Sequence, residues 1–266
     1  MDFKDLGLSE PTIKAIADAG LTTPTTVQAD VIPSILAGKD VFTIAPARCG
    51  KTCSYVLPLI DIIARHQVKN ILIITAGSKQ SVSVSDRFAV FNKYHEVNDN
   101  TTTETDDFMN NEANVIIASP NLLVDLMKEN KVDLSTVDIL VIDDINLIKK
   151  LHQLKNLQIV LDALPADRQN IIFTNRRSKE TQSILDKILQ TPAEIKVDRD
   201  KEAEADHEQD NEKNVKAERS ASSAARTTAE NQHDYEAVSL MKRYRTFGYK
   251  TPEFMLTKVE LVEDEG

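Results

Sequence analysis

Residues 41–52 read VFTIAPARCGKT, an apolar run followed by a short loop that ends in Gly50, Lys51 and Thr52. This is the spacing of a phosphate-binding loop, in which a strand leads into the loop and a helix follows it. In such a loop, backbone N–H groups bind phosphate oxygens, the lysine neutralises the β- and γ-phosphates, and the threonine ligates Mg²⁺. The alternative is a chance GKT in a turn. Because the strand, the loop and the helical pattern occur together, a nucleotide site is favoured.

Apolar runs like the one at 41–44 recur along the chain. The others are 71–75, 114–119, 138–143, 170–174 and 194–197. Amphipathic segments lie between them, among them 52–65, 121–129, 151–164 and 178–190. The runs are nearly all apolar, which is typical of strands covered on both faces of a parallel sheet. The alternation predicts an α/β fold with a mainly parallel central sheet.

Composition narrows the class of protein. The chain has 266 residues and a net charge of -10, which argues against coating nucleic acid by bulk attraction. Its two cysteines, Cys49 and Cys53, flank the loop and form neither a disulfide framework nor a zinc motif. We find no signal pattern and no apolar run of membrane-spanning length. The sequence therefore predicts a cytoplasmic protein without membrane association.

The chain divides into four segments. They are a helical lead-in at 1–40, the nucleotide domain at 41–198, a charged flexible linker at 199–234 and a tail at 235–266. Within the lead-in, helices are expected at 9–20 and 25–37, capped by Ser9 and Thr25. Within the tail, KRYRTFGYK (242–250) combines basic and aromatic residues. This patch is either a single-strand RNA contact or a segment that docks on the domain or on a protein partner, and its acidic flanks favour docking.

A second motif supplies the carboxylates that a magnesium nucleotide needs. In VIDD, Asp143 closes an apolar run and Asp144 follows directly. In such sites the first acid holds Mg²⁺, and the second orients or deprotonates the attacking water. Alone, two aspartates after a strand indicate a turn or a helix cap. Together with the phosphate loop in one sheet, the functional interpretation is favoured.

Taken in order, these motifs resemble the first RecA-like domain of the DEAD-box RNA helicases, from Phe3 to about Val197. The resemblance implies a RecA-like P-loop three-layer fold, ATP and Mg²⁺ as ligands, and RNA as a partner. The stretch 20–41 is similar to the family's Q motif, so Gln28 is expected to bind the adenine edge with Phe3 as its upstream aromatic. The family's base-stacking aromatic is replaced by Leu21.

The resemblance assigns roles residue by residue. It assigns the nucleotide to Phe3, Gln28, Ala45, Pro46, Ala47, Arg48, Cys49, Gly50, Lys51 and Thr52, the metal to Thr52 and Asp143, and catalysis to Lys51, Asp143 and Asp144. Arg48 stands where the family has glycine. If this position needs a positive φ, a non-glycine residue there costs roughly 1 kcal/mol or more; an arginine could also contact phosphate.

Other motifs also depart from the family pattern. The DEAD box is DDIN, so the catalytic glutamate is shortened to Asp144 and the last aspartate becomes Asn146. The serine-alanine-threonine motif becomes TNR at 174–176, and two arginines that grip the RNA backbone are replaced by Ser78 and Leu122. Nothing after residue 198 resembles the second RecA-like domain, which carries the family's arginine fingers.

The sequence therefore predicts an ATP-binding, weakly hydrolysing domain that acts on or near RNA with other components and is not an autonomous helicase. A catalytically silent pseudohelicase, serving as a nucleotide-sensing or structural protein-interaction module, is the alternative. A decaying helicase gene is a third, weaker one.

Overall fold

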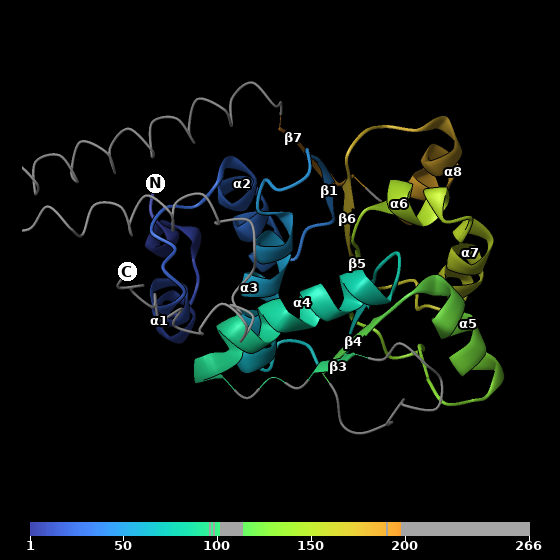
Figure 1. Ribbon diagram of the computed structural model, residues 1–266, viewed down its shortest axis with the longest axis horizontal. Helices are drawn as coiled ribbons and strands as arrows, with labels where there is room; N and C mark the ends of the chain where they lie inside the picture. The colour runs from blue at the N-terminus through green and yellow to red at the C-terminus, as the bar shows by residue number, and fades with distance from the viewer. Residues whose placement is uncertain (96, 98, 102–113, 190, 198–266) are drawn as a thin grey trace, which may run out of the picture. The chain divides into compact units, whose positions relative to one another are not determined.

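The computed structural model describes residues 1–95, 97, 99–101, 114–189 and 191–197, and its centre is one parallel sheet (Figure 1). The sheet has seven strands in the order β3-β4-β2-β5-β6-β1-β7. The strands are β1 (Val41–Ile44), β2 (Ile71–Ile74), β3 (Asp99–Thr101), β4 (Val115–Ala118), β5 (Ile139–Ile142), β6 (Gln169–Thr174) and β7 (Ala193–Lys196).

Helices cover both faces of the sheet, which gives the three layers expected from the sequence (Figure 1). One face carries α1 (Glu10–Asp18), α2 (Thr26–Leu36), α3 (Lys51–Ala64) and α4 (Ser78–Phe91), with the short 3-10 helices η1 (Phe3–Leu6) and η2 (Asn92–Tyr94). The other carries α5 (Pro120–Lys128), α6 (Ile145–Lys150), α7 (Leu154–Asp162) and α8 (Lys179–Ile188).

Successive side chains of each strand point to opposite faces of the sheet, so the sheet separates two hydrophobic cores. In β2, Ile71 and Ile73 pack beneath α3 and α4, whereas Leu72 and Ile74 pack beneath the helices of the other face. All four side chains are at most 1% exposed. The nearly unbroken apolar runs thus serve two cores, and the predicted α/β fold with a parallel sheet is confirmed.

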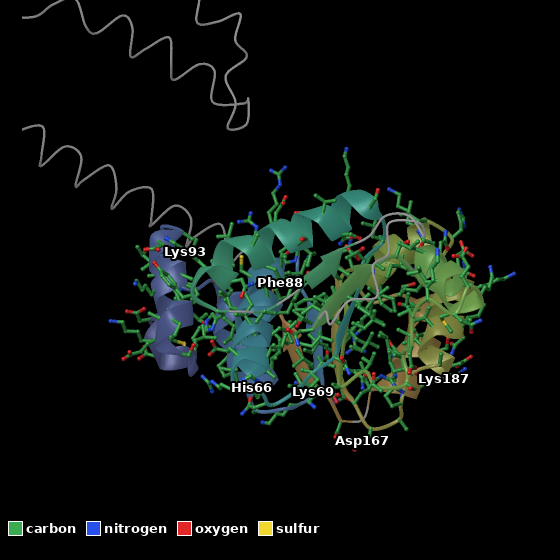
Figure 2. All side chains as sticks on the ribbon, turned by 90° about the horizontal axis from the view of Figure 1, so that it is seen from below. His66, Lys69, Phe88, Lys93, Asp167 and Lys187 are labelled. Atoms are coloured by element: carbon green, nitrogen blue, oxygen red, sulfur yellow. The ribbon has the colours of Figure 1, made fainter. Side chains whose placement is uncertain are left out.

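Some elements differ from the expectation. The expected helix at 151–164 is shorter and follows α6 after a turn, in which His152 adopts a φ of 58°. We did not predict α4, whose sequence contains four serines, a weak helix former. Its buried stripe includes Val84, Phe88 and Phe91, and Figure 2 shows Phe88 pointing into the interior beneath α4.

The two expected caps behave differently. Thr25 caps α2 and accepts from the backbone N–H of Gln28. Ser9 sits at the N-cap of α1 but makes no side-chain cap bond; instead its N–H and Oγ both donate, at 2.6 Å, to the carboxylate of Asp61.

Asp61 is a fully buried carboxylate at the centre of a polar cluster between helices. Besides Ser9, it accepts from Thr12 Oγ1 and from Arg65, the latter at 2.9 Å. His95 Nε2 lies 2.9 Å from Thr12 Oγ1. A buried charge needs such partners, so this cluster, defined by these five residues, fixes α1 and the chain after η2 to α3.

Several predictions lie outside the described residues. They concern the linker at 199–234 and the tail at 235–266 with its basic-aromatic patch at 242–250. Within the described ranges, no helix is long and apolar enough to cross a membrane. Cys49 and Cys53 are both free thiols.

Candidate nucleotide site

The loop from Ala45 to Gly50 joins the carboxyl end of β1 to the first turn of α3. Strands β5, β6 and β1 are neighbours in the sheet, so the segments that follow them share one edge. Ligands of open parallel sheets bind at the carboxyl ends of the strands. On the opposite edge, Lys69 and Asp167 mark the segments that enter β2 and β6 (Figure 2).

The lysine of the loop is held by loop carbonyls. Lys51 Nζ donates to the carbonyl oxygens of Ala45 at 3.0 Å and Pro46 at 2.6 Å. Gly50 precedes it with a φ of 85°. The ammonium therefore lies across the loop, on the path that phosphate oxygens take when they bind to backbone N–H groups.

Gln28 supports the loop from α2. Its Nε2 donates to the carbonyl of Gly50 at 3.4 Å, and its Oε1 accepts from the N–H of Thr25 at 3.0 Å. Thr25 Oγ1 donates to the carbonyl of Cys49 at 3.0 Å. A β-carbon at Gly50 would lie 2.6 Å from Gln28 Nε2 and 2.9 Å from Thr25 Oγ1. Only glycine allows this approach. One N–H and one lone pair of the amide stay available for the predicted adenine contact.

Arg48 adopts the left-handed conformation, with a φ of 69°. Position 48 thus needs the positive φ that glycine adopts easily, and an arginine in its place strains the loop by roughly 1 kcal/mol. The side chain is exposed. Its neighbour Cys49 is buried, and Cys49 Sγ lies 3.1 Å from the carbonyl oxygen of Pro46.

Asp143 lies at the end of β5, where its carboxylate is almost fully buried. Its Oδ2 accepts from Gln80 Nε2 at 2.9 Å and from Tyr55 Oη at 3.3 Å. The pKa of Asp143 is raised, because burial outweighs the bonds from Gln80 and Tyr55 that lower it; the neighbouring Asp144 charge raises it further and Lys51 opposes this. A bound Mg²⁺ would favour the ionised carboxylate that a metal ligand requires.

Tyr55 lies beside the predicted metal ligands. Its buried hydroxyl donates to Asp143 Oδ2 at 3.3 Å, and burial together with the Asp143 charge raises its pKa well above 10. Thr52 lies one turn earlier on the same face of α3. No group of three or more His, Cys, Asp or Glu side chains in the described part of the chain is placed to hold a metal. Mg²⁺ usually takes one or two carboxylates and completes its shell with waters and substrate phosphates. Thr52 and Asp143 fit that pattern.

Asp144, the predicted catalytic acid, has a structural contact as well. It is the N-cap of α6 with a φ of 65°, and its Oδ1 accepts from the N–H of Leu147 at 3.2 Å. The same side chain lines a depression of about 1100 Å³ at this edge of the sheet. One oxygen is therefore used in capping, and the other remains for chemistry.

The altered coupling motifs contact one another. Asn146 Nδ2 lies 2.7 Å from Thr174 Oγ1, 3.1 Å from Asn175 Oδ1 and 2.7 Å from the carbonyl oxygen of Arg176. All three partners can accept a hydrogen bond. The neutral amide thus ties the segment after β5 to the segment after β6.

The structure does not gather every predicted residue at the loop. Phe3 is 2% exposed and packs in the core with Leu6, so its predicted adenine contact stays a prediction. Ala47 is exposed on the loop, and Leu21 is 37% exposed. Ser78 begins α4 and Leu122 lies in the first turn of α5, and neither carries a charge for an RNA phosphate.

Sequence reasoning missed Tyr55 and Gln80. Tyr55 follows Thr52 by three residues, which places the two on one face of α3, so the spacing did hold a signal. Gln80 carried none, because its contact with Asp143 depends on the pairing of β2 with β5.

The comparisons with known proteins agree with this geometry. A model of the DEAD/DEAH box helicase family matches residues 25–183. Over 201 residues the chain is 26% identical to the DEAD-box ATP-dependent RNA helicase RhpA of Helicobacter pylori, covering 73% of this chain and 41% of that protein. Over 209 residues it is 28% identical to the probable ATP-dependent RNA helicase ddx10 of Dictyostelium discoideum, covering 74% and 24%.

Among solved structures, the chain is similar to a DEAD box protein from the hyperthermophile Methanococcus jannaschii. The TM-score is 0.69 at 21% identity, over 74% of this chain and 56% of that one. This likeness shows the fold. The chain spans less than half the length of the two curated relatives. Because the family model covers more than half of the chain, this protein belongs to the DEAD/DEAH box helicase family.

Proposed function

We propose that this chain binds adenine nucleotide with Mg²⁺ and is a weak ATPase that acts on or near RNA together with other components, not an autonomous helicase. One observation carries the proposal. Lys51 and Thr52 follow a glycine-dependent loop, and Tyr55, one turn after Thr52 on α3, donates its hydroxyl to the buried carboxylate of Asp143 at 3.3 Å. The groups proposed to bind a magnesium nucleotide therefore lie near one another.

Each group has a part in binding. Lys51 would exchange its two carbonyl partners for phosphate oxygens, and the start of α3 would offer backbone N–H groups to the same phosphates. Thr52 and Asp143 would hold Mg²⁺, which neutralises phosphate charge when bound. Gln28, already fixed to the loop, would place its amide against the adenine edge, which favours ATP over GTP.

Slow turnover is supported by the residues around the phosphates. Asp144 is one methylene shorter than glutamate, and one of its oxygens caps α6, so the remaining oxygen would reach less far toward an attacking water. A misplacement on the order of 1 Å can reduce a rate about 10²-fold. Ser78 and Leu122 offer RNA no charge, so RNA has few contacts from which to drive closure.

The capping role of Asp144 also favours the second candidate, a catalytically silent module that senses nucleotide or serves as a protein-interaction surface. Both candidates bind ATP. Turnover separates them, because the silent module gives no phosphate release above a Lys51→Ala background.

Calorimetry with Mg·ATP and Mg·ADP tests the binding step. Lys51→Ala should remove most of the affinity, because the lysine neutralises phosphate charge. Lys69→Ala is the matched control, since this exposed lysine lies at the opposite edge of the sheet (Figure 2). Equal binding by wild type and Lys51→Ala would disprove the assignment.

Phosphate release with and without single-stranded RNA tests turnover. We expect slow release, little stimulation and no strand separation on a short duplex. Strong RNA-stimulated hydrolysis or unwinding by the purified chain would contradict the proposal.

A further inference from the structure

The depression beside the phosphate loop is strongly basic. Five cations line it: Lys149, Lys150, Arg176, Arg177 and Lys196. Asp144 is the one acidic residue among the lining side chains that the structure describes. Such a surface attracts anions.

Two of these cations are already paired. Lys149 bonds to Glu180 at 2.7 Å and to Ser178 at 3.0 Å. Arg177 pairs with Glu194, and its guanidinium carbon lies 5.5 Å from the centre of the Phe42 ring. Their charges are largely compensated.

Arg176 differs from both. Its side chain is exposed in the depression, and no carboxylate of the described ranges forms a salt bridge with it. Its backbone is nevertheless held firmly. The carbonyl accepts from Asn146 Nδ2 at 2.7 Å and Thr174 Oγ1 at 2.8 Å, and the N–H donates to Thr174 Oγ1 at 3.4 Å. The backbone of Arg176 is thus fixed by hydrogen bonds, and no carboxylate in the described part of the chain pairs with its guanidinium.

The same depression adjoins the phosphate loop. Ala45 and Pro46, whose carbonyls hold the Lys51 ammonium, form part of its wall, and so does Asp144. An anion bound by Lys51 would therefore lie next to the depression. Phosphate is the anion that a guanidinium fork matches best, because two parallel N–H bonds meet two oxygens.

We propose that Arg176 contacts the terminal phosphate of bound ATP and thereby makes this chain bind the triphosphate more tightly than the diphosphate. The inference rests on the nucleotide binding proposed above and adds to it a cation supplied by the chain itself. ADP has no phosphate at this position, so Arg176 would contribute to one ligand and not to the other.

The test measures affinity and needs no turnover. Wild type, Arg176→Ala, Arg176→Lys and Arg177→Ala are titrated with Mg·ADP and with the magnesium complex of a non-hydrolysable ATP analogue. Arg176→Ala should weaken analogue binding by about tenfold or more, the scale of a lost charge-assisted bond, and leave ADP binding unchanged. Arg176→Lys should recover part of the loss. Arg177→Ala, whose charge is paired with Glu194, should bind both ligands like wild type.

The outcomes separate this inference from the broader proposal. If wild type binds both nucleotides but Arg176→Ala changes neither affinity, or lowers both equally, Arg176 does not read the terminal phosphate. If wild type binds neither nucleotide, the proposed function fails and the inference fails with it. Urea denaturation of Arg176→Ala checks folding. The backbone bonds of residue 176 do not involve its side chain, so an unchanged unfolding midpoint is expected.

Discussion

The side-chain amide of Asn146 lies 2.7 Å from Thr174 Oγ1, and its only partners in the described structure are acceptors. The hydroxyl of Thr174 donates in turn to the carbonyl of Arg176 at 2.8 Å. An aspartate at position 146 has no N–H to offer. Two departures from the family pattern are therefore complementary. Asn146, in place of the family's aspartate, is the donor, and the TNR segment at 174–176 supplies the acceptors.

Asn146→Asp should consequently destabilise the fold, although it restores the family's residue. A carboxylate cannot donate to Asn175 Oδ1 or to the carbonyl of Arg176, so these two exposed bonds are lost, which costs about 1 kcal/mol in the free energy of unfolding. Urea denaturation measures it. Asn156→Asp, which breaks an exposed amide bond to Asn121, is the matched control and should cost less. A variant as stable as wild type would show that the amide is not needed.

Gly50→Ala should impair nucleotide binding more than its backbone strain explains. The new β-carbon would meet Gln28 Nε2 at 2.6 Å and displace the amide from the loop. Gly38→Ala is the matched control, because Gly38 has a similar φ of 71° but a β-carbon added there would meet no atom within 4 Å. Both should lose about 1 kcal/mol of stability from strain. Only Gly50→Ala should also lose affinity for Mg·ATP, and equal affinities for the two variants would refute the contact.

Arg48→Gly should make the protein more stable. Residue 48 has a φ of 69°, which glycine adopts without strain, so the free energy of unfolding should rise by about 1 kcal/mol. Thermal or urea unfolding measures the change. If nucleotide affinity falls at the same time, Arg48 contacts phosphate; a decrease in stability would contradict the strain argument.

Gln28→Ala should narrow the difference in affinity between ATP and GTP. The amide can donate to and accept from the adenine edge, whereas an alanine can do neither. Because Gln28 also bonds to the loop at Gly50, the affinities for ATP and for GTP should both fall, and the affinity for ATP should fall more. Competition titrations with the two nucleotides measure the ratio, and an unchanged ratio would rule out adenine recognition by Gln28.

Protonation of His95 should lower the free energy of unfolding as the pH falls. Burial lowers the pKa of His95, and the nearby Asp61 carboxylate only partly opposes this. The folded pKa thus lies below the unfolded value of about 6.5, so protonation favours the unfolded chain. The stability contribution is complete above about pH 6.5 and is lost as the pH falls through the folded pKa. His95→Gln should lose less stability than wild type between about pH 7.5 and 5.5; parallel losses would exclude His95 as the cause.

Much of the fold could be read from the sequence, for a physical reason. Strands β1, β2, β5 and β6 are runs of buried β-branched and apolar residues, and each was located to within one residue. The edge strand β3 has the sequence Asp-Asn-Thr and no apolar run, so no sequence pattern predicted it. Helix α4 was missed because its first half is rich in serine, and the buried stripe itself includes Ser81 beside Val84, Phe88 and Phe91.

The site divides in the same way. Lys51, Thr52 and Asp143 belong to short motifs whose chemistry requires those residue types, and the structure brings them together. Gln80, the capping bond of Asp144 and the exposed guanidinium of Arg176 depend on which strands are neighbours and on which charges are already paired. No local pattern records either property.

The polar cluster around Asp61 also determines where a minimal fragment can begin. The family match starts at residue 25, but two side-chain donors to the buried carboxylate, Ser9 and Thr12, lie before that boundary. A fragment cut at Thr25 would leave Asp61 with Arg65 as its main partner, inside the helix whose first turn carries Lys51 and Thr52. An expression fragment of this domain therefore needs the first two dozen residues, although the family profile does not include them.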